Sequence, residues 1–190
     1  MSSVYHEIVN LSGRAISVAV HFCKGHKGQA MFLPHWHESV EILYLRQGGM
    51  QVLCDKDLFE VKEGDIVFVN PSTVHSGRCT AETVAYSCFI IDLKLFIGKG
   101  MDVADRELYA LQKGVNKVSP VIRGDGGLNA LLEEIIRLNE QPMERYAMLI
   151  KAKLFLLLSI LIHDYKNRDA VAALSVYWTT LMPTTKIKSR

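Results

Sequence analysis

Two histidines and a glutamate stand at alternating positions of one stretch of the chain. His35, His37 and Glu41 share a face if residues 35–45 form a β-strand, because side chains alternate between the two faces of a strand. A third histidine, His75, follows on a later turn. Imidazole nitrogen and carboxylate oxygen are ligands for borderline and hard divalent metals. The set therefore indicates either a metal site or a group of hydrogen-bonding side chains in a ligand pocket.

The stretches that must position these side chains have the pattern of short β-strands. Strands are expected over residues 4–9, 16–22, 35–45, 50–54, 58–61, 66–69 and 84–92. Turn residues separate them, and Gln47-Gly48-Gly49 is expected to be one of these turns. Short strands at such close spacing predict a small antiparallel barrel or sandwich. Both faces of residues 40–45 are apolar, so we expect that strand to be covered on both sides.

The spacing of apolar residues becomes helical after about residue 100. Helices are expected near 102–112, 128–138 and 144–166. In the third, four residues step by the seam spacing of a coiled coil: Ile150, Leu154, Leu157 and Leu161. A second stripe lies beside them: Phe155, Leu158 and Ile162. Two interpretations stay open, an antiparallel helix pair packed on the barrel and an exposed dimer seam.

Composition sets wide bounds on the class of protein. The 190 residues are 49% hydrophobic with a net charge of +2, so a packed core is expected and no overall charge favours nucleic acid. Four cysteines form no CxxC pair, and no signal peptide is evident, so we expect a cytoplasmic protein. The longest apolar run, 154–162, is shorter than the roughly 20 residues of a membrane span, so no membrane partner is expected.

The histidine motif resembles the two sequence motifs of the cupin superfamily. The matching residues are His35, His37, Glu41, Gly48, Gly64 and His75. Three positions depart from the second motif, which usually has Pro, Gly and Asn there: Asn70, Ser72 and Cys79. These positions shape the turn that aims His75, so the departures favour the fold over a working metal site. We therefore assign no cofactor and leave a divalent metal as the alternative.

The order of barrel, crossover and helix pair resembles the N-terminal effector-binding and dimerisation domain of AraC-type transcription regulators. The likeness covers roughly residues 5–166. It is carried by His35-Trp36-His37-Glu38, Gly64-Asp65, Pro71 to His75, Phe89-Ile90-Ile91-Asp92 with Leu95-Phe96, and the helix from Lys151 to Leu161. The implied fold is mainly β, a cupin-like jelly-roll barrel (double-stranded β-helix) followed by an antiparallel helix pair.

The resemblance also implies a division of the chain into three parts. Residues 1–98 are expected to form the effector-binding barrel, 99–168 a helical dimerisation region packed on it, and 169–190 a tail truncated relative to the family. Family members bind DNA through two helix-turn-helix units, which need on the order of 100 residues. Only 22 residues follow Arg168, so we expect the DNA-binding domain to be missing from this chain.

The function that this resemblance implies is small-molecule sensing and dimerisation within a transcription regulator. The effector would be a sugar or related metabolite. Its expected binding residues are His35, His37, Glu41, His75, Tyr44 and Tyr86, and the expected homodimer interface is Ile150, Leu154, Leu157 and Leu161. The alternative is a small metal-dependent cupin enzyme, a dioxygenase, isomerase or epimerase, with His35, His37, Glu41 and His75 as metal ligands. The added helices favour the sensor, since a minimal enzyme barrel needs no dimer seam.

Overall fold

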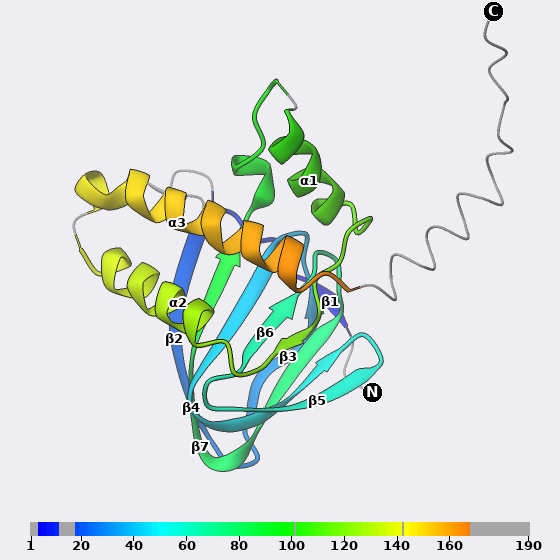
Figure 1. The fold of residues 1–190 in the computed structure, drawn as a ribbon. Coiled ribbons are helices and arrows are strands. Elements are labelled where there is room, and N and C mark those ends of the chain that lie inside the picture. The colour runs from blue at the N-terminus through cyan, green and yellow to red at the C-terminus, as the bar shows by residue number, and fades with distance from the viewer. Residues whose placement is uncertain (1–3, 12–17, 101, 142, 168–190) are drawn as a thin grey trace, which may run out of the picture.

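The computed structural model describes residues 4–11, 18–100, 102–141 and 143–167 (Figure 1). Its elements in chain order are β1 (Tyr5–His6), β2 (Val18–His26), β3 (Ala30–Trp36), β4 (Val40–Cys54), β5 (Asp57–Lys62), β6 (Ile66–Val69), β7 (His75–Ile91), a short 3-10 helix η1 (Leu93–Leu95), α1 (Val103–Gln112), β8 (Val121–Ile122), α2 (Gly126–Asn139) and α3 (Met143–Asp164). The expected tail 169–190 and the start of the expected strand at 16 lie outside the described residues.

Two long strands, β4 and β7, pair with each other and run through both halves of a barrel. The first half of β7 pairs with β3 and its second half with β2, while β4 pairs with β6 near its start and with β5 near its end. We call β2, β6, β8 and the adjoining halves of β4 and β7 the helix-side sheet. We call β3, β5 and the other halves of β4 and β7 the open sheet. This arrangement confirms the predicted mainly β fold with C-terminal helices.

Several of the expected strand boundaries are wrong, and the strand expected at 84–92 already begins at His75 as part of β7. Gln47-Gly48-Gly49 is not a turn but a bulged point within the continuous strand β4, where the register with β7 shifts. Gly48 has φ of 72°, and a Cβ there would lie 1.9 Å from the Thr83 carbonyl oxygen, so only glycine fits this bend. The expected strand 35–45 is likewise broken, because β3 ends at Trp36 and β4 begins at Val40.

The buried residues form two apolar cores, one on each side of the helix-side sheet. Leu43 and Leu45 of β4 point into the barrel, whereas Ile42 and Tyr44 point outward beneath the helices. Every residue from Val40 to Leu45 is buried, which confirms that this strand is covered on both faces. The fold therefore stacks barrel interior, sheet and helices as successive layers (Figure 1).

The helices α2 and α3 lie side by side over the helix-side sheet (Figure 1). The four residues of the expected dimer seam are fully buried within the single chain: Ile150, Leu154, Leu157 and Leu161. That assignment of the interface is therefore wrong, because these side chains already fill the core between α3, α2 and the sheet. The antiparallel pair packed on the barrel is the correct interpretation of the stripe.

The crossover from α1 to α2 is tied to the barrel by polar contacts. The buried Asn70 side chain donates to the Val118 carbonyl (2.8 Å) and accepts from the Val118 amide (2.9 Å). Arg123 pairs with the buried Asp65 at 2.6 Å, and β8 adds to the sheet beside β6. The region after residue 98 therefore contributes a strand to the barrel as well as helices.

One described helical segment is long and apolar enough to cross a membrane by length and composition alone. It covers Tyr146–Asp164, and 33% of its apolar window is buried in the chain. Core helices of soluble proteins pass the same test, and the inner side of α3 packs in the core described above.

Candidate functional site

The four predicted ligand residues converge at one end of the barrel. His35 lies near the end of β3, His37 in the connection to β4, Glu41 near the start of β4 and His75 at the start of β7. All four are buried, and one ligand atom from each lies within 4.8 Å of the others. The strand break after Trp36 does not disperse them, because β3 and β4 both border β7. The predicted convergence is therefore present even though the predicted single strand is not.

All three imidazoles are oriented by the backbone. Each Nδ1 faces a carbonyl oxygen two residues away: His35 that of Leu33 (2.8 Å), His37 that of Ser39 (3.0 Å) and His75 that of Thr73 (2.9 Å). A carbonyl oxygen only accepts hydrogen bonds, so each Nδ1 carries the proton and donates it. Nε2 is then the lone-pair nitrogen of a neutral ring. Metal-binding histidines are commonly held in this way, by a hydrogen bond from the ring nitrogen that does not bind the metal.

The contacts between Glu41 and two of the histidines require a positive charge, because the facing atoms would otherwise all be hydrogen-bond acceptors. Its Oε2 lies 2.9 Å from His37 Nε2 and 3.1 Å from His75 Nε2. With the ring protons on Nδ1, these contacts would place lone pairs against a carboxylate oxygen. Additional protons that make the rings imidazolium, or a divalent cation bound by them, resolve the conflict. The cluster thus binds either protons or a metal ion.

The charges of the cluster shift the pKa of its members. Burial alone would raise the pKa of Glu41, but hydrogen bonds from His37 and His75 and their charges outweigh it and hold the pKa well below its usual range. Burial alone would lower the pKa of His37, but the hydrogen bond and charge of Glu41 leave that pKa raised. The pKa of His35 is lowered, chiefly by burial. His37 is thus more readily a cation than His35.

The second oxygen of Glu41 has a partner that sequence reasoning missed. The Cys88 thiol donates to Oε1 at 3.3 Å, and burial raises the pKa of this thiol well above its usual value, which keeps it protonated. Tyr86 lies two residues earlier on the same face of β7, in the interior core near Glu41. The alternation along β7 could have placed Cys88 inside the barrel, but its partner comes from 47 positions away.

A second missed partner is a carboxylate of the N-terminal segment. Glu7 Oε2 lies 3.2 Å from His35 Nε2, and β1 runs parallel to β3 beside it. The Tyr5 ring stacks on His35 with centroids 5.4 Å apart, and the His6 ring stacks on Trp36 at 4.0 Å. Residues 5–7 therefore cover the His35 side of the cluster. Nothing in their sequence pattern linked them to a site about 30 residues further along the chain.

Tyr44, which was predicted to bind the effector, lies away from the cluster. It follows Glu41 by three positions, so the strand alternation places it on the opposite face, in the core beneath the helices. Burial raises the pKa of Tyr44, and the negative charge of Glu133 on α2 raises it further. The structure thus places Tyr86 inside the barrel, where Glu41 also lies, and places Tyr44 on the opposite face of the sheet.

The turn before His75 keeps its shape despite its unusual residues. Ser72 has φ of 63°, the left-handed conformation that glycine adopts readily, and its amide donates to the His37 carbonyl at 2.8 Å. The chain accepts local strain of about 1 kcal/mol here. The unusual residues of this turn do not turn His75 away from Glu41, and the expected absence of a working metal site stays a prediction.

The cluster fits a divalent metal in its donor types and its orientation. The three Nε2 atoms of His35, His37 and His75, with a carboxylate oxygen of Glu41, would hold the ion. A bound divalent ion would supply a Lewis acid with coordination positions for oxygen donors. This chain's own residues fix the ring orientations, through the backbone carbonyls, and the carboxylate, through Cys88.

We predict that metal-free protein loses part of its stability as the pH rises. The folded-state pKa of His37 lies above its unfolded value, so its contribution is complete below about pH 6.5 and is lost as pH rises through the raised pKa. The loss is about 1.4 kcal/mol per unit of pKa difference. Urea unfolding in EDTA between pH 6.5 and 9 measures it. His37→Gln should flatten this dependence, while His26→Gln on the exposed edge of β2 should leave it unchanged. Equal slopes for all three proteins would contradict it.

Comparison with known proteins gives one family and several structures. The model of the AraC-like ligand binding domain matches residues 22–158. No curated protein sequence gives a significant match. A cupin 2 conserved barrel domain protein from Rhodopseudomonas palustris is 20% identical, with a TM-score of 0.38 over 45% of this chain and 57% of that one. A cupin 2 conserved barrel domain protein from Salinispora arenicola is 18% identical, with a TM-score of 0.39 over 46% and 74%.

A third structure, a predicted oxalate decarboxylase from Thermotoga maritima, is 23% identical, with a TM-score of 0.36 over 38% of this chain and 64% of that one. Two of these three matches thus span less than two thirds of the other protein's length, and their scores support no inference about activity. The family match covers most of the chain and includes the barrel, the histidine cluster and most of α3. This protein belongs to the family of AraC-like ligand-binding domains.

Proposed function

We propose that this chain is the small-molecule sensing and dimerisation module of an AraC-type transcription regulator acting in the cytoplasm. The observation that carries the proposal is the buried convergence of His35, His37, Glu41 and His75 inside the segment that matches the family. A few convergent polar groups in an otherwise apolar interior are what orients a small ligand. Hydroxyl groups of a sugar or related metabolite would pair with these groups, and Tyr86 adds a phenol nearby.

An effector should raise the melting temperature of the purified protein. A ligand that binds only the folded state stabilises it by mass action, by about 2.7 kcal/mol at a hundredfold excess over Kd. Thermal unfolding across a metabolite panel should identify such a compound, and Glu41→Gln should reduce the shift because it removes the charge that organises the cluster. Glu82→Gln, on an exposed residue paired with Lys27, should leave the shift intact. A panel without a shift, or a shift indifferent to Glu41, would count against the proposal.

A metal-dependent cupin enzyme is the second candidate, favoured by the orientation of the three Nε2 atoms. Metal content separates the two. For the sensor we expect well under one equivalent of Fe, Mn, Ni, Cu or Zn in protein purified without added metal, since protons can serve the cluster. Elemental analysis that finds about one equivalent, lost in His37→Ala but kept in His26→Ala, would promote the enzyme.

The proposed dimer uses the outer face of α3. Four apolar side chains on it are exposed, at 86% for Met148, 44% for Leu149, 37% for Phe155 and 52% for Leu156. A helix with one apolar face in the core and another in water calls for a partner surface. A second copy related by a two-fold axis would cover this face with the same face of its own α3. The proposed interface thus uses these four exposed side chains instead of the buried stripe, and of the second predicted stripe only Phe155 belongs to it, because Leu158 and Ile162 are buried.

Light scattering tests this dimer at micromolar concentration. The wild type should be dimeric, and Leu156→Glu should give a folded monomer because a carboxylate buried between apolar faces is costly. Leu58→Glu, at an exposed leucine of β5 in the open sheet, is the matched control and should leave the assembly unchanged. Leu154→Glu serves as the internal control, since it should unfold the chain by disrupting the core. A monomeric wild type would end the proposal.

A further inference from the structure

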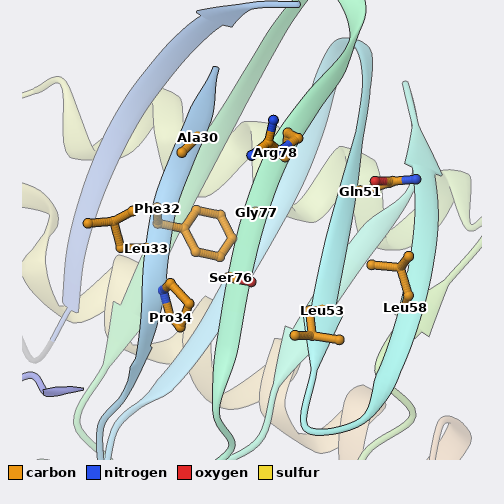
Figure 2. Close-up of a pocket in the computed structure, with 10 residues that line it drawn as sticks. All are labelled: Ala30, Phe32, Leu33, Pro34, Gln51, Leu53, Leu58, Ser76, Gly77 and Arg78. Atoms are coloured by element: carbon orange, nitrogen blue, oxygen red, sulfur yellow. The ribbon is translucent and has the colours of Figure 1, made fainter. Parts of the chain in front are cut away.

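A groove lies on the outer face of the open sheet, on the side away from the helices (Figure 2). Its volume is about 300 Å³, within the lower range for small-molecule sites. It is lined by Ala30, Phe32, Leu33, Pro34, Gln51, Leu53, Leu58, Ser76, Gly77 and Arg78. Leu33 and Leu58 are 59% and 60% exposed, so much of this apolar wall is open to water.

Phe32 joins the groove to the histidine cluster. Phe32 is among the residues that line the groove, and its ring, which packs against the core inside the barrel, contacts two of the imidazoles, His35 edge-on at 6.1 Å and His75 at 5.8 Å between centroids. Gly77 makes room for this ring, because a Cβ there would lie 2.5 Å from a ring carbon of Phe32. A change in the position of the ring would therefore alter the packing around both histidines.

The strand that carries Phe32 is less firmly paired than its neighbours. The register of β3 with β7 shifts between Ala30 and Phe32 and again between Phe32 and His35. Bulges of this kind interrupt the ladder of backbone hydrogen bonds. Displacement of Phe32 thus breaks fewer pairings than displacement of a residue in β4, which pairs on both sides.

The positively charged Arg78 lies at the same groove and pairs with no acidic side chain among the described residues. Arg78 is exposed and donates to the Gly28 carbonyl at 3.3 Å, and within the described ranges it forms no ion pair. The other charged group nearby, Glu60, is engaged by the Gln51 amide of the groove wall. A guanidinium group recognises carboxylates through its fork of N–H donors. The groove therefore offers an apolar floor and, at one end, a guanidinium group that forms no ion pair within the described residues.

We propose that this groove is the outer part of the effector site and binds a small organic carboxylate with an apolar body. Arg78 binds the carboxylate, and Leu53 and Leu58 contact the apolar body. A bound ligand displaces the Phe32 ring and so alters the packing of His35 and His75. The inference rests on the proposed sensing function and narrows the effector from metabolites in general to this chemical class.

Fluorine NMR with 4-fluorophenylalanine incorporated at all phenylalanines tests the groove, with hexanoate as the probe and hexanamide as its neutral counterpart. The Phe32 signal is assigned by its loss in Phe32→Leu. Hexanoate should move this signal saturably, and hexanamide at equal concentration should not. Arg78→Met should weaken hexanoate binding about tenfold or more, because a charge-assisted contact is lost. Arg106→Met, an exposed arginine on α1, is the matched control and should bind as the wild type does.

Gly77→Ala provides a second variant that leaves the charge in place. Its added methyl group should displace the Phe32 ring, shift the Phe32 signal without ligand and weaken hexanoate binding. If hexanoate leaves the Phe32 signal unchanged, or moves it equally in Arg78→Met, the proposal is overturned. An effector that requires Glu41 but is indifferent to Arg78 and Phe32 would overturn the groove and leave the sensing function standing. Absence of any effector would remove the sensing function itself.

Discussion

The structure depends on one buried charge, the carboxylate of Glu41. A buried carboxylate is costly unless each oxygen is paired, and here one oxygen faces two imidazoles while the other accepts from a thiol. The partners come from the β3–β4 connection and from both ends of β7, so they hold these segments in one relative position. Apolar packing alone would tolerate small slips between strands. The charge does not tolerate them, because a slipped partner would leave it uncompensated.

The same strands carry this cluster on one face and the helices on the other. Glu41 is followed by Ile42, and Cys88 by Phe89, so residues that organise the cluster neighbour residues that support α2 and α3. The Asn70–Val118 pair and the Arg123–Asp65 pair fasten the crossover to the barrel at two further points. A displacement of β4 or β7 would therefore reach the helical layer through directly packed side chains.

The sequence predicted the parts of this molecule that depend on local pattern. The convergence of His35, His37 and Glu41 was predicted from one strand that the structure breaks after Trp36, and His75 joined them through the second cupin motif. The helices followed from apolar periodicity. The break after Trp36 and the bend at Gly48 did not follow, because a glycine permits a turn and a bulge equally. The dimer interface was assigned to the wrong residues because a stripe of apolar residues on a helix shows that the stripe is buried, but not whether the same chain or a second copy buries it. Cys88 and Glu7 required knowledge of strand pairing, whereas the outward direction of Tyr44 was available from the alternation itself.

The hydrogen bonds from the three Nδ1 atoms to backbone carbonyls also determine which molecules the inner end of the barrel can discriminate. They leave three ring lone pairs and two carboxylates, Glu41 and Glu7, around one small volume. Such a surface has more acceptors than protons to share among them. Where a guest rather than an added proton or metal ion met these acceptors, the surface would favour molecules that donate hydrogen bonds, such as alcohols or ammonium groups, over ethers and ketones, which only accept. Backbone geometry, rather than any side chain that touches the guest, would then be the origin of chemical selectivity.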